Sequence, residues 1–211
     1  MKIITLEDIK EILPDVDLIP AIEAGFVAYS AGRAIVPPVG ELLLDKGEVH
    51  IKYGYIKSDD YYVIKVASGF YDNRDLGLPS SNGLMLLFSQ ETGQLVSILL
   101  DEGYLTDLRT AVAGAIAAKY LAPELVRCVG IVGSGIQAKQ QLMMLRQVVD
   151  FRDVLVLGLD EVQLKQYQDD MIALGFHVEI VPDTGSLMAR CDLIVTCTPA
   201  ATPLMAAADL R

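Results

Sequence analysis

The sequence predicts an α/β protein in two parts. The second part is an incomplete, doubly wound parallel sheet, and the first is an α+β domain with a largely antiparallel sheet. Three observations lead to this prediction. A glycine-rich turn joins an apolar strand to a helix at residues 129–149, and strand and helix patterns alternate from there on. Short strand-like runs without intervening helices fill residues 41–100.

The first part begins with two helices. Thr5-Leu6-Glu7-Asp8 has a capping-box pattern and predicts a short helix to about Leu13. Pro20 is expected to begin a second helix that runs to Ala31, with Gly32 as its C-cap. Turns containing Asp, Gly and Asn then separate strand-like runs, which predicts a largely antiparallel sheet. The runs are Glu41–Leu44, Val49–Tyr55, Tyr61–Ala67, Leu84–Ser89 and Leu95–Leu100.

A helix rich in small residues connects the two parts. The pattern from about Thr106 to Leu121 is helical and contains five alanines and Gly114, so this helix can lie very close to another element. Pro123 ends it. We therefore expect a first domain over residues 1–121, for substrate binding and dimerisation, and a second over residues 122–211.

The second part alternates between strands and helices. This order predicts a doubly wound parallel sheet whose binding edge lies at the carboxyl ends of the strands. Four strands are visible, whereas a full sheet of this kind usually has about six, so we expect the sequence to stop inside this domain. The elements are strand Arg127–Val132, helix Ile136–Val149, strand Val154–Leu157, helix Val162–Leu174, strand His177–Val181, a short helix near Leu187 and strand Leu193–Cys197.

The turn Gly133-Ser134-Gly135-Ile136-Gln137-Ala138 has the form GxGxxA. Its glycines allow a tight turn and let backbone N–H groups approach a pyrophosphate, and Ala138 lets the helix pack close to the strand. The helix N-terminus then faces the negative charge. A merely structural turn is the alternative, because glycines are common at strand ends. The strand before and the helix after favour a Rossmann-type dinucleotide site made by these six residues.

Composition indicates an ordered core and argues against two classes of partner. Apolar residues make up 52% of the chain, and the formal net charge is −11. That sign disfavours nucleic acid and anionic membrane surfaces. No apolar run approaches the length of a membrane span, and no charged-then-apolar leader opens the chain.

The cysteines and histidines do not have the spacing of metal ligands. Cys128, Cys191 and Cys197 lack metal-ligand spacing, and His50 and His177 lack ligand-spaced partners. We expect a cytoplasmic protein with buried thiols and no metal site.

Several motifs follow one another in a distinctive order. They are Lys65-Val66-Ala67-Ser68-Gly69, Gly77-Leu78-Pro79-Ser80, Gly83-Leu84, Glu91-Thr92-Gly93, Leu105-Thr106-Asp107-Leu108-Arg109-Thr110-Ala111 and the turn at residues 133–138. Together they resemble the ornithine cyclodeaminase/mu-crystallin family, from about Arg33 to the end of the chain. The resemblance implies an enzyme that moves a hydride between a nicotinamide cofactor and the Cα of an amino acid or cyclic imine.

The resemblance implies that Arg33, Lys65 and Arg109 bind the α-carboxylate of the substrate. The residues themselves leave alternatives open. Lys65 interrupts an apolar strand, where it could also be paired with an internal carboxylate. Arg109 in the first turn of a helix suits an anion or a surface salt bridge, and Arg33 follows a helix end, where any cation is favourable. We also expect Ser80 and Glu41 at the substrate, although Glu41 could equally be a solvated carboxylate at a strand end.

Cofactor choice depends on the end of the second strand of the alternating part. An acidic residue there would bind the ribose 2′-OH of NAD, and an arginine would favour NADP. The nearest acid is Asp160, and no arginine lies between the end of that strand and Lys165. We therefore predict NAD, with NADP as the alternative, and assign Asp160 and Thr198 to the cofactor-binding residues. The resemblance implies a catalytic aspartate beyond Arg211, so we assign no catalytic residue and expect little or no turnover by the 211-residue chain.

The resemblance is compatible with three kinds of activity. In cyclodeamination, ornithine loses hydride to NAD⁺, closes to a ring with loss of ammonia, and regains the hydride to give proline. Related members reduce a cyclic ketimine such as pyrroline-2-carboxylate, or oxidise alanine. Others are non-catalytic, mu-crystallin-like binding proteins. We expect a cyclodeaminase-like enzyme of small amino or imino acids that forms a homodimer through its first domain.

Overall fold

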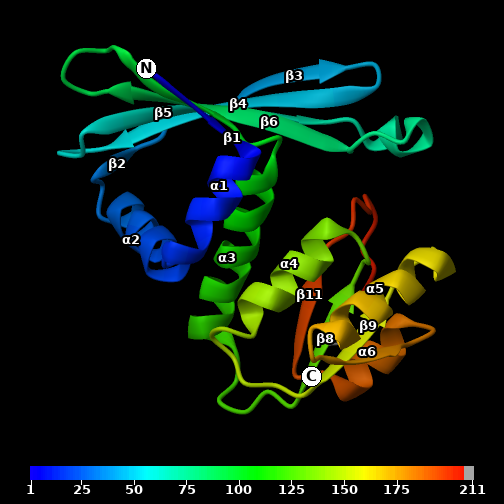
Figure 1. Ribbon diagram of the computed structural model, residues 1–211. Helices are drawn as coiled ribbons and strands as arrows, with labels where there is room; N and C mark the ends of the chain where they lie inside the picture. The colour runs from blue at the N-terminus through cyan, green and yellow to red at the C-terminus, as the bar shows by residue number, and fades with distance from the viewer. Residues whose placement is uncertain (207–211) are drawn as a thin grey trace. The chain divides into compact units, whose positions relative to one another are not determined.

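A computed structural model describes residues 1–206 and divides the chain into two compact units, Met1–Arg109 and Thr110–Arg211 (Figure 1). The division between the units falls inside helix α3 (Tyr104–Leu121). The last residues of the predicted second domain, 207–211, lie outside the described part. The assignment of substrate binding and cofactor binding to two domains that meet at residue 121 stays a prediction.

The first unit contains a seven-stranded sheet in the order β1-β7-β6-β5-β4-β2, with β3 also paired to β4. Only β1 runs parallel to its neighbour, β7, so the sheet is largely antiparallel as predicted. The sequence pattern did not indicate β1 or β2, because strands of four and two residues are too short to show an alternation. The bounds are β1 (Lys2–Thr5), β2 (Ala34–Ile35), β3 (Gly40–Leu44), β4 (Gly47–Ile56), β5 (Tyr61–Gly69), β6 (Ser81–Ser89) and β7 (Leu95–Leu100).

Helices α1 (Leu6–Ile12) and α2 (Leu18–Ser30) confirm the two helices predicted for the first unit, and short 3₁₀ turns follow at η1 (Leu13–Asp15) and η2 (Tyr71–Leu76). The capping box is present, since Thr5 Oγ1 accepts from the N–H of Asp8 at 3.3 Å while Asp8 Oδ2 accepts from the N–H of Thr5 at 2.8 Å. Helix α2 begins two residues before Pro20. Proline is tolerated there because N–H groups of the first turn have no acceptor within the helix.

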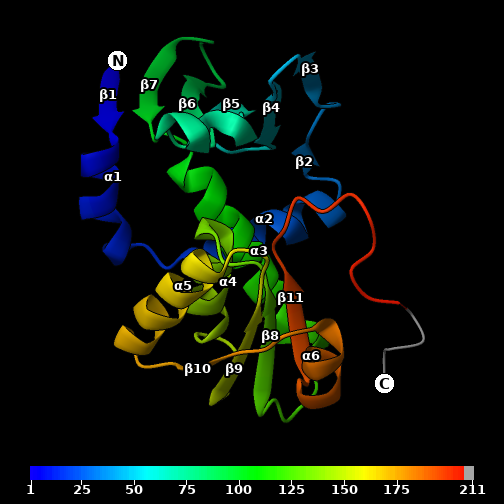
Figure 2. The same ribbon diagram turned by 90° about the vertical axis from the view of Figure 1, so that its right-hand side faces the viewer.

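The second unit contains a four-stranded sheet in the order β10-β9-β8-β11, and all of its strand pairs are parallel (Figure 2). This order confirms the doubly wound architecture. From β8 the chain adds β9 and β10 on one side, and it then returns to place β11 on the other side of β8. Helix α4 ends four residues earlier than predicted. The bounds are β8 (Cys128–Val132), α4 (Ile136–Leu145), β9 (Asp153–Leu157), α5 (Glu161–Ala173), β10 (His177–Ile180), α6 (Thr184–Arg190) and β11 (Leu193–Thr196).

Both faces of the second sheet are covered, and β8 at its centre is buried throughout. Val129 and Ile131 pack with α4 and α5, whereas Cys128 and Val132 pack with Leu187 of α6 on the opposite face. This alternation follows from the period of two in a strand. None of the helices within residues 1–206 is both long enough and apolar enough to cross a membrane.

The second half of α3 packs closely on α4, as its small residues predict. A Cβ built at Gly114 would lie 2.1 Å from Oε1 of Gln141, so no larger residue fits without displacing that side chain. Gln141 is buried, and its Nε2 donates to the carbonyl of Thr110 at 3.1 Å. This contact fixes α4, and with it the glycine turn that precedes α4, against the helix that begins the second unit.

Candidate functional site

Lys65 lies at the middle of β5, with its side chain half-buried. Antiparallel pairing sets Lys52 of β4 directly opposite it. Burial, together with the positive charges of Arg109 and Lys52, lowers the pKa of Lys65 to about 8 against the opposing fields of Asp101 and Asp107. The structure thus brings two of the predicted carboxylate-binding residues, Lys65 and Arg109, into one electrostatic cluster within the first unit.

Asp101 is a buried carboxylate of this cluster that sequence reasoning missed. It is 1% exposed, and its Oδ2 accepts from the N–H of Leu105 at 2.9 Å, which caps the first turn of α3. Its Oδ1 has no hydrogen-bond partner among residues 1–206. Glu102 and Gly103 follow with φ of 53° and 87°, so the chain turns sharply between β7 and α3. An aspartate just before the helical pattern was the available signal, but its burial depends on the packing of the unit.

The other predicted substrate residues lie elsewhere in the first unit. Arg33 is exposed in the turn after α2 and is not among the charged groups that shift the pKa of Lys65. The Glu41 carboxylate lies 3.8 Å from Nδ1 of His50 across the β3–β4 pair, with about half of its side chain exposed. Ser80 precedes β6, and its carbonyl accepts from the N–H of Phe70 at 2.7 Å. These contacts do not link Arg33, Glu41 or Ser80 to Lys65, and their roles stay predictions.

In the second unit, the predicted dinucleotide turn follows the carboxyl end of β8. Gly133 has φ of +115°, a conformation that residues with a Cβ rarely adopt. A Cβ built there would lie 2.6 Å from the carbonyl oxygen of Cys197 and 3.3 Å from Cγ2 of Thr198. Gly133 and Thr198 therefore meet where β8 and β11 end side by side. Ser134 lies at the same edge, since its Oγ is 3.5 Å from a Cβ built at Gly158.

The N-terminus of α4 is open. Its N-cap, Gly135, makes no side-chain capping hydrogen bond, and a Cβ built at Gly135 would meet no described atom within 4 Å. The following residue, Ile136, is exposed, and Gln137 accepts weakly from Gln141 at 3.5 Å. Ala138 is fully buried, and its carbonyl accepts from the hydroxyl of Tyr167 at 3.3 Å. The turn thus combines free space at Gly135 with a tightly packed helix behind it.

Asp160 already has a structural role. It is the N-cap of α5, and its Oδ1 accepts from the N–H groups of Val162 and Gln163 at 2.9 Å and 3.0 Å. It stands three residues beyond the end of β9, in a segment where Leu159 is fully exposed. One oxygen of the carboxylate is therefore engaged in the cap, and a ribose hydroxyl would have to use the other.

The cationic cluster at Lys65 and the glycine turn before α4 both have the chemistry of anion sites. Lys65, Lys52 and Arg109 form a cationic group around a half-buried ammonium, which suits a carboxylate ligand. The backbone N–H groups that begin α4, at a turn with room for a ligand, suit a pyrophosphate. No group of three or more His, Cys, Asp or Glu side chains capable of holding a metal ion occurs in the described part of the chain.

Comparison with known proteins agrees with this arrangement. The model of the ornithine cyclodeaminase/mu-crystallin family matches residues 2–209. A protein of Sinorhizobium fredii, named as an uncharacterized cyclodeaminase, is 36% identical over all of this chain and 65% of its own. An archaeal alanine dehydrogenase dimer with bound NAD superposes with a TM-score of 0.89 at 32% identity, covering 99% of this chain and 63% of its own.

A third similar protein is Δ¹-pyrroline-2-carboxylate reductase of Thermococcus litoralis, in complex with NADH and L-proline. It superposes with a TM-score of 0.93 at 26% identity, covering all of this chain and 66% of its own. The chain therefore spans about two thirds of the length of each of these relatives.

Proposed function

This chain belongs to the ornithine cyclodeaminase/mu-crystallin family, and from that membership we propose that it serves NAD(H)-dependent chemistry at the Cα of a small amino or imino acid. The observation that carries the proposal is the cationic cluster at Lys65. Asp101 and Asp107 offset only part of the cost of a half-buried ammonium beside two other cations, because the pKa of Lys65 stays lowered, so an added anion would stabilise it. The α-carboxylate shared by amino acids and cyclic imino acids is such an anion.

On the substrate side, Lys65 and Arg109 hold the carboxylate. The guanidinium of Arg109 attracts the carboxylate at long range, and its planar shape suits bidentate binding. Lys65 supplies a protonated donor from a rigid strand. Asp101 opposes the loss of the Lys65 proton through its field, which keeps this donor charged near neutral pH. Fixing the carboxylate fixes the position of Cα, and positioning of this kind can lower a barrier by several kcal/mol.

On the cofactor side, the residues fit a dinucleotide. Gly133 permits the tight turn, Gly135 leaves the space for a pyrophosphate, and the N–H groups of α4 would hold its charge. When bound, NAD supplies the acceptor or donor of a hydride. Asp160 and Glu161 are negatively charged at the end of the second strand of the parallel sheet, which favours the 2′-OH of NAD over the 2′-phosphate of NADP.

For the activity itself we propose ornithine cyclodeaminase-like chemistry, supported by the likeness to the protein of Sinorhizobium fredii that is named as an uncharacterized cyclodeaminase. Alanine oxidation is the second candidate, favoured by the 32% identity to the archaeal alanine dehydrogenase. Reduction of a cyclic ketimine is the corresponding reverse chemistry on a preformed imine. All three reactions use the same carboxylate clamp, so the residues named above serve each of them.

The proposal is tested by calorimetric titration of the chain with NADH and with NADPH, followed by titration of the NADH-loaded protein with L-proline, L-ornithine and L-alanine. We expect NADH to bind more tightly than NADPH, and one of the amino acids to bind only when Lys65 is present. A folded protein that binds neither dinucleotide would contradict the proposal. Binding without turnover would agree with the expectation that the 211-residue chain has little or no activity.

A further inference from the structure

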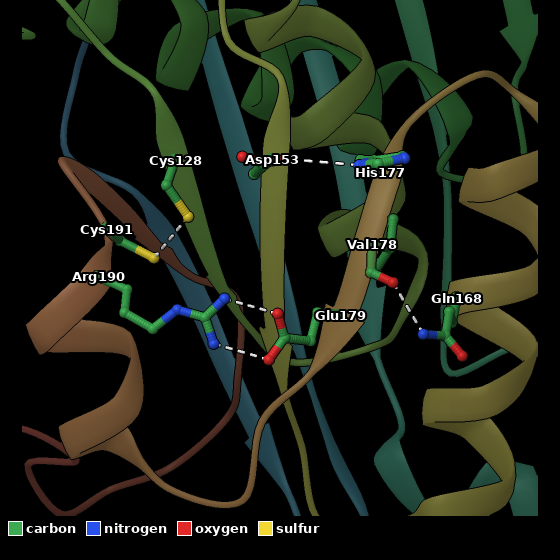
Figure 3. Close-up of polar contacts among 8 residues, drawn as sticks. All are labelled: Cys128, Asp153, Gln168, His177, Val178, Glu179, Arg190 and Cys191. Carbon is green, nitrogen blue, oxygen red and sulfur yellow. Dashed lines mark hydrogen bonds and ion pairs between the residues drawn. The ribbon is translucent and has the colours of Figure 1, made fainter.

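Two cysteines of the second unit face each other at the amino edge of its parallel sheet, the edge opposite to the glycine turn. Cys128 is the first residue of β8, and Cys191 ends α6 just before β11. Their Sγ atoms lie 3.5 Å apart, and the two side chains point toward one another (Figure 3). Both thiols are free; Cys128 is buried and Cys191 is half-buried.

The backbone around this pair is held in register by Asp192. Its N–H donates to the carbonyl of Cys128 at 2.9 Å, and its Oδ2 accepts from the N–H groups of Arg127 at 2.8 Å and Cys128 at 3.2 Å. The N–H of Cys191 donates to the carbonyl of Leu187 at 2.8 Å. Both sulfur atoms therefore extend from backbone that is hydrogen-bonded on each side.

Gly130 provides the space in which the Cys191 side chain lies. A Cβ built at Gly130 would be 3.1 Å from Cys191 Sγ, tighter than an ordinary contact. Because Gly130 has no side chain, the sulfur can lie over β8 and approach Cys128 from the face that α6 covers. The pairing of the two thiols thus depends on a specific feature of the central strand.

We propose that Cys128 and Cys191 form a dithiol–disulfide site that a low-molecular-weight disulfide, such as glutathione disulfide, oxidises to a covalent link between β8 and the α6–β11 junction. A disulfide bond is about 2.05 Å long, so the sulfur atoms must approach by about 1.5 Å when the bond forms. The site is distinct from the candidate anion sites, and its chemistry does not depend on them.

The reaction is an ordinary thiol–disulfide exchange. The thiolate of Cys191, the more accessible of the two, attacks one sulfur of the reagent, whose S–S bond breaks and releases the first reagent thiol. Cys128 then attacks the Cys191 sulfur of the mixed disulfide, and the second reagent thiol leaves. The two protein thiols lose two electrons and two protons, and the reagent is reduced to two thiols that carry those protons.

The surroundings of the pair determine how readily it reacts. Burial raises the pKa of both thiols, so little thiolate is present at neutral pH and the first attack is slow. For the same reason the reduced pair gains no stabilisation as thiolate, which favours the disulfide at equilibrium. The nearby positive charge, Arg190, is engaged by both carboxylate oxygens of Glu179 at 2.6 Å and 2.7 Å (Figure 3). The fields of Asp153 and Asp192 also raise the pKa of Cys128. The site should therefore respond to sustained oxidation.

The test is to incubate the reduced chain with glutathione disulfide at mildly alkaline pH and to count free thiols in denaturant with Ellman's reagent. We expect the count to fall from three to one, with a mass loss of two hydrogen atoms. The link joins residues that are 63 apart, so the Tm should rise by about 10 °C and return on treatment with dithiothreitol.

The matched variants are Cys128→Ser, Cys191→Ser and Cys197→Ser. Only Cys197→Ser should still form an intramolecular disulfide, with its thiol count falling from two to none. Peptide mapping of the oxidised wild type identifies the linked cysteines without relying on any variant. A wild type that keeps three thiols, that carries only mixed disulfides, or that links Cys197 would overturn the proposal.

Discussion

Lys65 is a cation in a half-buried strand position, opposite a second lysine and under the field of an arginine. An apolar side chain of similar length would avoid both the burial of charge and the like-charge repulsion. A charged group that costs stability in this way is a candidate for binding. The same residue therefore connects the stability of the first unit with its proposed ability to hold a carboxylate.

We expect Lys65→Met to raise the Tm by a few degrees at pH 7 and to abolish binding of the amino-acid ligand. Because the pKa of Lys65 is lowered to about 8 from 10.5, the cost of its charge is fully present below pH 8 and disappears as the pH rises through this range. The gain in Tm should therefore shrink between pH 8 and 10.5 in scanning calorimetry. The control is Lys52→Met, at an exposed position, with a smaller gain. A lower Tm in Lys65→Met would contradict this account.

Gly133 and Gly135 differ in what a side chain would disturb. At Gly133 the positive φ and the nearby Cys197 carbonyl mean that any larger residue strains the unit itself. Blocked approach of a pyrophosphate is then only part of the expected effect of Gly133→Val, and loss of binding by that variant would be ambiguous. Gly135 has φ of −82° and open space around it, so a methyl group there is harmless to the free protein.

Gly135→Ala is thus the sharper test of the cofactor turn. We expect an unchanged Tm and at least about a tenfold loss of NADH affinity in calorimetric titration, because the added methyl group occupies the space of the pyrophosphate. Gly25→Ala, where a Cβ also meets nothing within 4 Å, is the control and should bind NADH as the wild type does. Unaltered affinity in Gly135→Ala would remove the turn from the proposed site.

Helix α4 begins without a side-chain cap, whereas α5 and α6 each begin with a capping aspartate. Asp160 caps α5 and Asp183 caps α6, whereas Gly135 leaves α4 without a side-chain cap. A side-chain cap occupies N–H groups that an anion could otherwise use. The helix without a side-chain cap is the one that follows the glycine turn, so an anion could cap its N-terminus at the edge where β8 ends.

The two capped helices offer a matched pair for the NAD prediction. Asp160→Ala and Asp183→Ala each remove a cap and should lower the Tm by about 3 °C. If Asp160 also contacts the ribose 2′-OH, only Asp160→Ala weakens NADH binding. Asp160→Asn preserves capping while it removes the charge, so it should keep the Tm and shift the NADH-to-NADPH affinity ratio toward NADPH. Equal ratios in all three variants would show that Asp160 serves only as a cap.

The first unit as a whole exposes apolar surface. Strand β3 is exposed along its length, and the side chains of Leu42, Leu43 and Leu44 are 55%, 74% and 51% exposed. Apolar residues on an outer strand favour contact with a second chain. This surface agrees with the homodimer that the sequence predicts through the first domain, and the archaeal alanine dehydrogenase is described as a dimer.

We expect light scattering to give the mass of a dimer at micromolar concentration. Leu43→Asp should shift the protein toward monomer, because it places a charge on the most exposed leucine of the strand. Leu159→Asp, at a fully exposed position in the second unit, is the control and should leave the mass unchanged. A wild type that is monomeric and well folded would contradict dimerisation through this surface.

Periodicity and turn chemistry were enough to predict most elements of both units. These patterns are local. The capping box at Thr5 marks where a helix begins, and the spacing of apolar residues shows which face of a strand or helix is buried. The start of α2 differs by two residues from the prediction at Pro20, and the short strands β1 and β2 were missed, whereas β10 and β11 were predicted within the alternation of strands and helices.

The sequence by itself determined the class of fold and the glycine turn, because these follow from residue types at fixed spacing, whereas Lys65 and Arg109 became candidate ligand residues through the resemblance to the family. Tertiary structure decided which side chains meet. Lys52 lies opposite Lys65 through strand register, Asp101 is buried by the packing of its unit, and Cys128 meets Cys191 across 63 residues. Such contacts depend on register and packing between distant segments, and no local pattern in the chain encodes them.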